Sequence, residues 1–198
     1  MKTIITISRE FGAAGGEIGR QLAEELNLQY YDKEIILMAA KHSNLDVDSL
    51  IEWDEKLQKN FGFAQSLFDF YNRPLSDKIF EAQTKVIREI GERGNCVIVG
   101  RNADSILREY DGCLTVFIHA DLDWRVHRMS KKMPEERIDK IVEKAKLVDQ
   151  ARSKYYSYHV HRDFGMANNY DLSLCSSRLG IDMCVQIIKD LINARSGK

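Results

Sequence analysis

The chain has 198 residues, 44% of them hydrophobic and 30% charged, which suits one domain with a buried core. Its 29 basic and 30 acidic residues leave a formal net charge of -1, without the basic bias of a non-specific nucleic-acid binder. No apolar run approaches the length of a membrane span, and the N-terminal run is too short for a signal peptide. We therefore expect a cytoplasmic protein without nucleic-acid or membrane partners.

The first half of the chain opens with a strand and a helix. Residues 3–8 form a continuous apolar run that predicts a buried strand, and residues 15–27 place apolar side chains on one helical face. A short strand at 28–31 and a short helix at 33–41 are predicted next. Residues 44–76 are less regular and rich in aromatic side chains, which we interpret as helices of an insert. Residues 77–93 show a clearer helical stripe.

The second half alternates strands and helices. Buried strands are predicted at 95–99, 113–118 and 171–175. Apolar spacing predicts a helix from about Asp121, a second helix with Pro134 in its first turn, and a C-terminal helix from Ile181. Residues 155–169, rich in Tyr, His and Asn, look like a loop. Apolar strands that alternate with helices favour a parallel sheet covered on both faces, within a single α/β domain with helical inserts.

The cysteines and histidines suggest neither a disulfide nor a metal site. The four cysteines have no C-x-x-C spacing and lie mostly in apolar runs, so we expect free thiols: Cys96, Cys113, Cys175 and Cys184. His159 and His161 are two residues apart with no cysteine nearby, which is an incomplete ligand set for zinc.

A glycine-rich turn joins the first predicted strand to the first helix. Gly12, Gly15 and Gly16 would let the backbone approach an anion, and the helix N-terminus would offer free N–H groups. The alternative is a tight strand-to-helix turn without a ligand. The turn lacks the lysine of the phosphate-binding pattern G-x-x-x-x-G-K-S/T, so positive charge must come from elsewhere. Arg9, Arg20 and Arg101 are the candidates, and Arg101 follows a buried strand at the edge where α/β sheets bind ligands.

Several segments together resemble the cytidylate kinase-like proteins of the P-loop kinase superfamily. They are ITISREFGAAGGEIGRQLAEEL, YYDKEI, CVIVGRNADSIL, LTVFIHADLDWRVHRM and YDLSLCSSRLGID, in that order over nearly the whole chain. The resemblance implies a three-layer P-loop kinase fold with a five-stranded parallel sheet, a helical acceptor-binding insert at about 33–93 and a mobile lid at about 130–165. It also implies ATP as the phosphoryl donor, Mg²⁺, and CMP or dCMP as the acceptor.

The same resemblance assigns roles by position. The phosphate loop and its helix would bind ATP through Gly12, Ala13, Ala14, Gly15, Gly16, Glu17, Ile18 and Arg20. Asp32, Arg101 and Asn102 would bind the acceptor. Charge around the transferred group would come from Arg9, Arg101, Arg125, Arg128 and Arg152, with Asp149 beside the last of these. Glu17 or Asp32 could hold Mg²⁺ through water, and the sequence does not choose between them.

Two departures from the family pattern bear on activity. Against the standard loop, Arg9 falls near the first glycine, Gly15 near the lysine, and Gly16 near the hydroxyl residue that binds Mg²⁺. Asn102 replaces the aspartate that follows the arginine in the family's motif, which bears on cytosine preference. With these departures, the resemblance still implies a nucleotide-binding phosphotransferase. A non-catalytic nucleotide-binding or regulatory protein and a kinase for another small acceptor are the alternatives.

Overall fold

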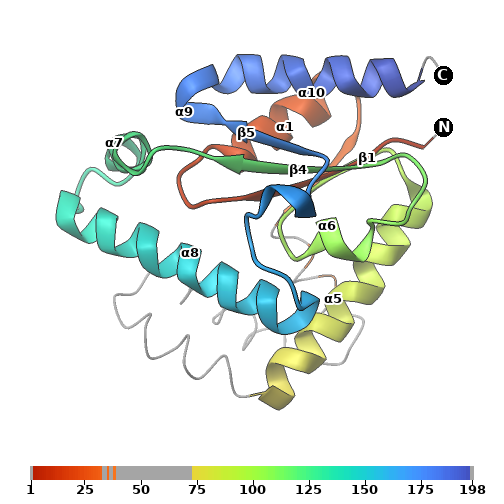
Figure 1. Cartoon of the computed structure of the whole chain (residues 1–198), viewed down its shortest axis with the longest axis horizontal. Helices are drawn as coiled ribbons and strands as arrows, with labels where there is room; N and C mark the ends of the chain where they lie inside the picture. The colour runs from red at the N-terminus through yellow and green to blue at the C-terminus, as the bar shows by residue number, and fades with distance from the viewer. Residues whose placement is uncertain (1, 33–34, 36–37, 39–72, 197–198) are drawn as a thin grey trace.

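The structure is a computed structural model that describes residues 2–32, 35, 38 and 73–196. A five-stranded parallel sheet in the order β2-β3-β1-β4-β5 forms its centre (Figure 1). The strands are β1 (Ile4–Arg9), β2 (Gln29–Tyr31), β3 (Cys96–Val99), β4 (Cys113–His119) and β5 (Leu172–Cys175). The central strand β1 pairs with β3 on one side and β4 on the other, with Arg9 in register with Ile118. This arrangement confirms the predicted strands and the parallel sheet.

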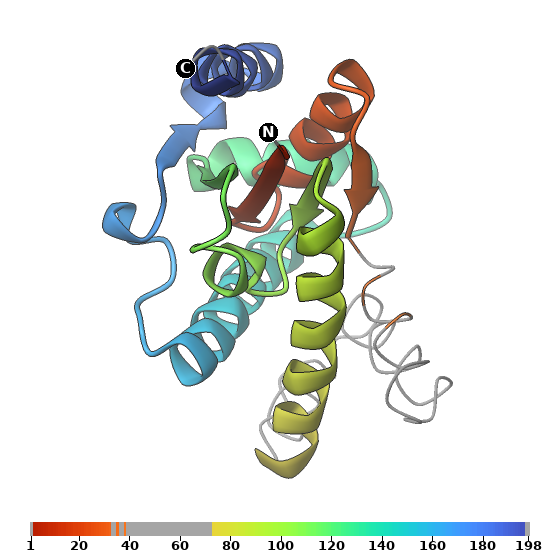
Figure 2. The same cartoon turned by 90° about the vertical axis from the view of Figure 1, so that its right-hand side faces the viewer.

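Helices cover both faces of the sheet, as predicted (Figure 2). One face carries α1 (Gly15–Glu25) and α10 (Ile181–Ser196), and the other carries α5 (Arg73–Arg93), α6 (Ala103–Ile106) and α8 (Ile138–Val160). Side chains alternate along a strand, so β1 feeds two cores: Ile5 and Ile7 pack with α1 and α10, whereas Ile4 packs with α5 and α6. The helices α7 (Leu122–Lys132) and α9 (Ser176–Leu179) follow the carboxyl ends of β4 and β5.

Residues 155–160 belong to α8, which corrects the predicted loop at 155–169. Tyr156 is 1% exposed and donates a hydrogen bond to Asp104 of α6. The ring of His159 stacks on Phe80 of α5 with the centroids 4.1 Å apart. These contacts stabilise a helix that the polar sequence of this segment does not predict. Tertiary packing contributes more to helix stability than local propensity does. Beyond His161, which ends α8 with a φ of 58°, the segment is a loop with one 3-10 turn at Ala167–Asn169.

Pro134 precedes α8 and does not open it, which corrects a second prediction. The Glu136 N–H donates to the Met133 carbonyl at 3.0 Å, so Pro134 is the second residue of a β-turn, where its fixed φ is favoured. The helix begins only at Ile138. The other predicted elements agree to within a few residues where the chain is described, although the helices at 33–41 and 44–76 lie largely outside the described residues. The bounds of the insert and the lid stay predictions.

Two further features follow from the described residues. All four cysteines are free, with Cys96 and Cys184 buried and Cys113 and Cys175 partly buried. Among the described helices, none is both long and apolar enough to cross a membrane.

Candidate functional site

The candidate phosphate loop connects the carboxyl end of β1 to the first turn of α1. Gly12 and Ala14 have φ values of 78° and 68°, and this left-handed backbone turns the chain sharply into the helix. Ala14 caps the helix without a side-chain hydrogen bond, and its carbonyl accepts from the N–H groups of the third and fourth residues after it. The N–H groups of Ala14, Gly15 and Gly16 find no acceptor in the described part of the chain. They are therefore available to an anion.

The back of the loop is fastened to neighbouring elements. The Ala13 carbonyl accepts a hydrogen bond of 2.8 Å from the hydroxyl of Ser176, which also lies 3.2 Å from the His119 carbonyl. The Ile18 side chain is fully buried in the core. Ala13 and Ile18 thus hold the loop in place and offer a ligand no side chain. Sequence reasoning missed this role of Ser176, whose one signal is its place directly after a predicted strand.

An ion pair between α7 and α8, of which the arginine is buried and the aspartate partly exposed, holds the main chain ahead of the glycines. Asp149 accepts a 2.7 Å hydrogen bond from the Phe11 N–H and pairs with Arg125 at 2.6 Å. Arg125 in turn donates to the Phe11 carbonyl at 3.0 Å and lies 3.6 Å from Glu10, with 8% of its side chain exposed. The structure therefore places Arg125 behind the loop, against the backbone of Phe11.

Arg128 joins α7 to the loop further along the chain, at Gly12 and Glu17. Its guanidinium donates to the carboxylate of Glu17 and lies 3.5 Å from the Gly12 carbonyl. Lys132 lies 3.4 Å from the same carboxylate. Two cations of α7 thus neutralise Glu17, which leaves it a poorer candidate for a metal ligand than its sequence position indicates.

Arg9, Arg101 and Arg152 interact electrostatically with one another near the carboxyl ends of β1 and β3. Arg9 lies 3.6 Å from Asp32, and Arg152 donates to the Arg9 carbonyl at 2.8 Å. Burial lowers the pKa of Arg152, and the charge of Arg9 lowers it further. Burial also lowers the pKa of Arg9, which Asp32 opposes and Arg101 reinforces. Because arginine keeps its proton, a bound anion would relieve this repulsion.

Arg101 and Asn102 occupy a strained turn between β3 and α6. Gly100, Arg101 and Asn102 have φ values of 77°, 61° and 55°, and the Ala103 N–H closes the turn on the Gly100 carbonyl at 3.1 Å. This conformation costs a residue with a Cβ about 1–2 kcal/mol, although asparagine adopts it more readily than arginine does. Asn102 is 7% exposed, and its amide nitrogen has no hydrogen-bond partner among the described residues. Strain of this kind collects at ligand sites.

Tyr30 and Asp32 connect β2 to the loop. The Tyr30 hydroxyl lies 3.2 Å from the Gly16 carbonyl and 3.4 Å from Asp32. Burial and the charge of Asp32 raise the pKa of Tyr30 to about 12, so the hydroxyl stays a donor at neutral pH. Arg20 is exposed and lies over the Tyr30 ring, 4.6 Å from its centroid. Arg20 therefore contributes its charge on the β2 side of the loop.

A buried carboxylate beneath β1 is a residue that sequence reasoning missed. Asp104 is 1% exposed and accepts hydrogen bonds from Ser8 at 2.9 Å and from Tyr156 at 2.8 Å. Asp104 of α6 thus connects the carboxyl end of β1 to α8. Burial raises the pKa of Asp104, against the effect of both hydrogen bonds. The only sequence signal was its place two residues after Asn102.

Replacing Asp104 with asparagine is expected to remove a decline in stability with rising pH. Because the pKa in the folded state is raised above the unfolded value of 3.8, this group stabilises the fold fully below 3.8, and the contribution is lost as pH rises through the folded pKa. Asparagine has the same shape and does not ionise. Urea unfolding over a pH series should show the free energy of unfolding of the variant rising relative to that of the wild type as pH rises. A difference that is independent of pH would contradict this expectation.

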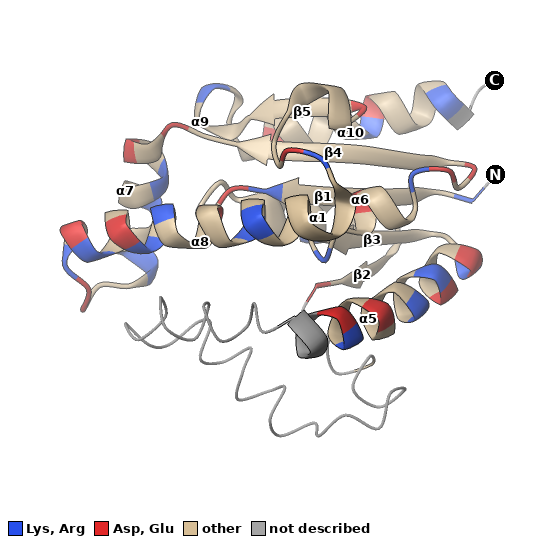
Figure 3. Ribbon diagram, turned by 60° about the horizontal axis from the view of Figure 1, so that its bottom comes forward, with Lys and Arg blue, Asp and Glu red and all other residues tan. Residues whose placement is uncertain are grey.

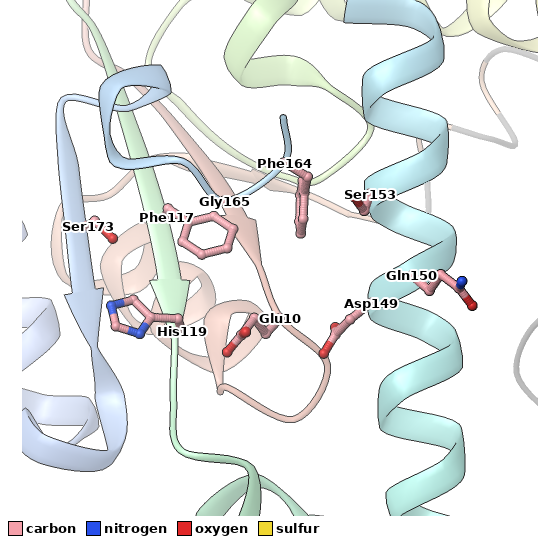
Figure 4. A pocket seen from close by; sticks show the side chains of 9 residues that line it. All are labelled: Glu10, Phe117, His119, Asp149, Gln150, Ser153, Phe164, Gly165 and Ser173. Atoms are coloured by element: carbon pink, nitrogen blue, oxygen red, sulfur yellow. The ribbon is translucent and has the colours of Figure 1, made fainter. Parts of the chain in front are cut away.

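A pocket of about 480 Å³ lies beside the loop, on the α8 side of the sheet (Figure 4). Phe117 and Phe164 line one part of it, and Glu10 and Asp149 line another. Glu10 and Asp149 already face Arg125, and the described residues that line the pocket include no lysine or arginine, so it offers a phosphate group no cation of its own. Figure 3 shows that α7 and α8, which flank the carboxyl ends of the strands, carry both acidic and basic residues. The loop N–H groups and the three arginines are therefore the candidate anion site.

Solved structures share this fold. An uncharacterized protein from Eubacterium ventriosum, 23% identical, superposes with a TM-score of 0.73 over 97% of this chain and 99% of that chain. Shikimate kinase from Bacteroides thetaiotaomicron, 15% identical, gives 0.57 over 98% and 99%. The YorR protein of Bacillus subtilis, in complex with phosphorylated GDP and 12% identical, gives 0.53 over 99% of both chains. The fold is thus that of the α/β P-loop kinases.

Sequence comparison identifies the family. A search of curated protein sequences returned no match. The profile of the cytidylate kinase-like family matches residues 4–178. This range contains all five strands, the candidate phosphate loop and the arginines around it. The chain therefore belongs to the cytidylate kinase-like family.

Proposed function

We propose that the chain is an ATP-dependent kinase that transfers the γ-phosphoryl group to a nucleoside monophosphate of the CMP or dCMP type. One observation carries the proposal: loop N–H groups without an acceptor in the described residues adjoin the mutually repelling arginines Arg9, Arg101 and Arg152. The N–H groups suit the β- and γ-phosphates of the donor. The guanidinium groups suit the charge on the transferred group. Membership of a kinase-like family supports the same activity.

In the proposed reaction, an oxygen of the acceptor phosphate attacks the γ-phosphorus of ATP. The new P–O bond forms as the bond to the β,γ-bridging oxygen breaks, and ADP leaves with that electron pair. The protein performs no covalent step, so it contributes position and charge. In this proposal Arg101, on the turn after β3, would hold the acceptor phosphate, whereas Arg9 and Arg152 would act nearer the loop.

Asp32 fits a Mg²⁺ ion better than Glu17 does. Its carboxylate lies 3.9 Å from where a Cβ of residue 16 would stand, so it faces the first turn of α1. Both carboxylates have cationic neighbours: Asp32 lies 3.6 Å from Arg9, and Glu17 is paired with both Arg128 and Lys132. No cluster of three or more His, Cys, Asp or Glu that could bind a metal occurs in the described ranges, so phosphate oxygens and water would supply most ligands. A bound Mg²⁺ would neutralise charge on the phosphates.

ADP release from ATP and Mg²⁺ tests the proposal, measured with CMP, dCMP, UMP, AMP, GMP and non-nucleotide acceptors. We expect CMP or dCMP to stimulate release most. Stimulation by another acceptor alone would favour the alternative of a different small-molecule kinase. A rise in melting temperature with ATP, without stimulation by any acceptor, would favour a nucleotide-binding protein that does not transfer phosphate. The panel thus separates the three functions that the sequence left open.

A further inference from the structure

The phosphate loop of this chain holds an arginine and a glycine in reversed places. The standard pattern G-x-x-x-x-G-K-S/T has glycine at its first position and lysine six residues later, in the first turn of the helix. In this chain the corresponding positions are Arg9, the last residue of β1, and Gly15, the first residue of α1. The cation has therefore moved from the helix to the strand, and the glycine from the strand to the helix.

Residues 9 and 15 cannot both carry a side chain in this backbone. A Cβ added at Gly15 would lie 2.6 Å from the Cβ of Arg9 and 2.9 Å from its Cγ, and real Cβ atoms essentially never make non-bonded contacts shorter than 3.0 Å. Arg9 cannot easily retreat, because it is in register with Ile118 of β4. The next glycine is different: among the described residues, the atom nearest to a Cβ at Gly16 would be the Tyr30 hydroxyl, at 3.6 Å. Of the two glycines that open α1, Gly15 is therefore the one whose side chain Arg9 excludes.

A second glycine makes room for the other end of the same side chain. A Cβ at Gly100 would lie 2.1 Å from a terminal nitrogen of Arg9, so the guanidinium rests directly on the Gly100 backbone. Asp32 lies 3.6 Å from this guanidinium, and Arg152 fixes the Arg9 carbonyl at 2.8 Å. The stem of Arg9 therefore passes under the loop, and its charge emerges between the loop and the turn that carries Arg101.

We propose that Arg9 is the phosphate-loop cation of this protein and that Gly15 is the residue that makes room for it. The inference rests on the proposed kinase function and assigns one group within it. A cation on β1 that reaches Gly100 lies between the loop N–H groups, which would bind the donor phosphates, and Arg101, which would bind the acceptor phosphate. A lysine on α1 would instead extend from the donor loop. Arg9 then holds the transferred phosphoryl group and the acceptor phosphate together and takes no part in bond making.

Exchanging the two residues tests the proposal. Gly15→Lys alone should lower the melting temperature by about 5–10 °C, because an overpacked core site typically costs 1–3 kcal/mol. Gly16→Ala, one residue further along the same helix, should leave it within about 3 °C of the wild type. Arg9→Gly should fold and lose acceptor-stimulated turnover by about 10²–10³-fold. The double variant Arg9→Gly/Gly15→Lys should recover the stability lost in Gly15→Lys and at least 10-fold of the turnover lost in Arg9→Gly.

A sharper control keeps only the β-carbon of residue 9. Arg9→Ala/Gly15→Lys retains the two Cβ atoms that would stand 2.6 Å apart, so it should stay as unstable as Gly15→Lys. The proposal is overturned if Gly15→Lys is as stable as Gly16→Ala, if the alanine and glycine double variants behave alike, or if Arg9→Gly keeps its turnover. A wild type with neither turnover nor an ATP-induced rise in melting temperature would overturn the kinase function itself, and the role of Arg9 with it.

Discussion

Replacing Arg101 with glycine is expected to reduce acceptor-stimulated turnover about 10³-fold, the scale on which arginines act in phosphoryl transfer, without lowering stability. The change removes the guanidinium that the turn after β3 presents to the acceptor. It also relieves backbone strain, because Arg101 has a φ of 61°, a value that glycine adopts at little cost. Stability and activity should therefore change in opposite directions. Initial rates over a range of acceptor concentrations, together with thermal unfolding, measure both effects.

A matched variant separates the backbone from the charge. Asn27 is exposed just after α1 and has a φ of 51°. Asn27→Gly therefore places glycine at another left-handed backbone position, away from the site. It should leave turnover unchanged. ATP should still raise the melting temperature of Arg101→Gly, since the loop N–H groups are intact. Unaltered dependence on the acceptor in Arg101→Gly would remove this residue from the acceptor site.

Replacing Asp149 with alanine is expected to destabilise the protein by about 2–4 kcal/mol, slightly below the 3–5 kcal/mol for a fully buried pair. The side chain of Asp149 is 22% exposed and its partner Arg125 only 8%, so the change leaves a buried cation without its closest carboxylate. It also leaves the Phe11 N–H without its acceptor. Because Phe11 precedes the glycines of the loop, turnover should fall as well. Urea unfolding measures the first effect and ADP release the second.

The same helix offers a control for this ion pair. Asp139 of α8 is 59% exposed and pairs with Arg137 at 3.0 Å, so Asp139→Ala should leave the free energy of unfolding close to that of the wild type. Asp149→Asn should fall between the two, because its amide oxygen can still accept from Phe11 while the charge is lost. Equal losses for Asp149→Ala and Asp139→Ala would show that the buried pair does not hold the loop.

Local patterns determined much of the fold. The apolar runs at 3–8, 95–99 and 113–118 predicted β1, β3 and β4, because a strand buried on both faces is apolar along its whole length. The stripe from Ile181 likewise predicted α10. The glycine-rich turn was recognisable for a similar reason, since φ values such as the 78° of Gly12 require particular residues at particular places. These are properties of residues that are close together in the chain, so a single sequence is enough to predict them.

The tertiary structure decided the contacts between residues far apart in the chain. Ser8 and Asp104 are 96 residues apart, Asp104 and Tyr156 are 52 apart, and no local period connects them. That network, with the stacking of His159 on α5, made a helix of residues 155–160 where composition suggested a loop. The sequence alone showed that Arg9 and Gly15 stand where the standard pattern has glycine and lysine. Only the folded backbone showed that the two positions compete for one space, because a steric exclusion exists only once strand and helix are packed.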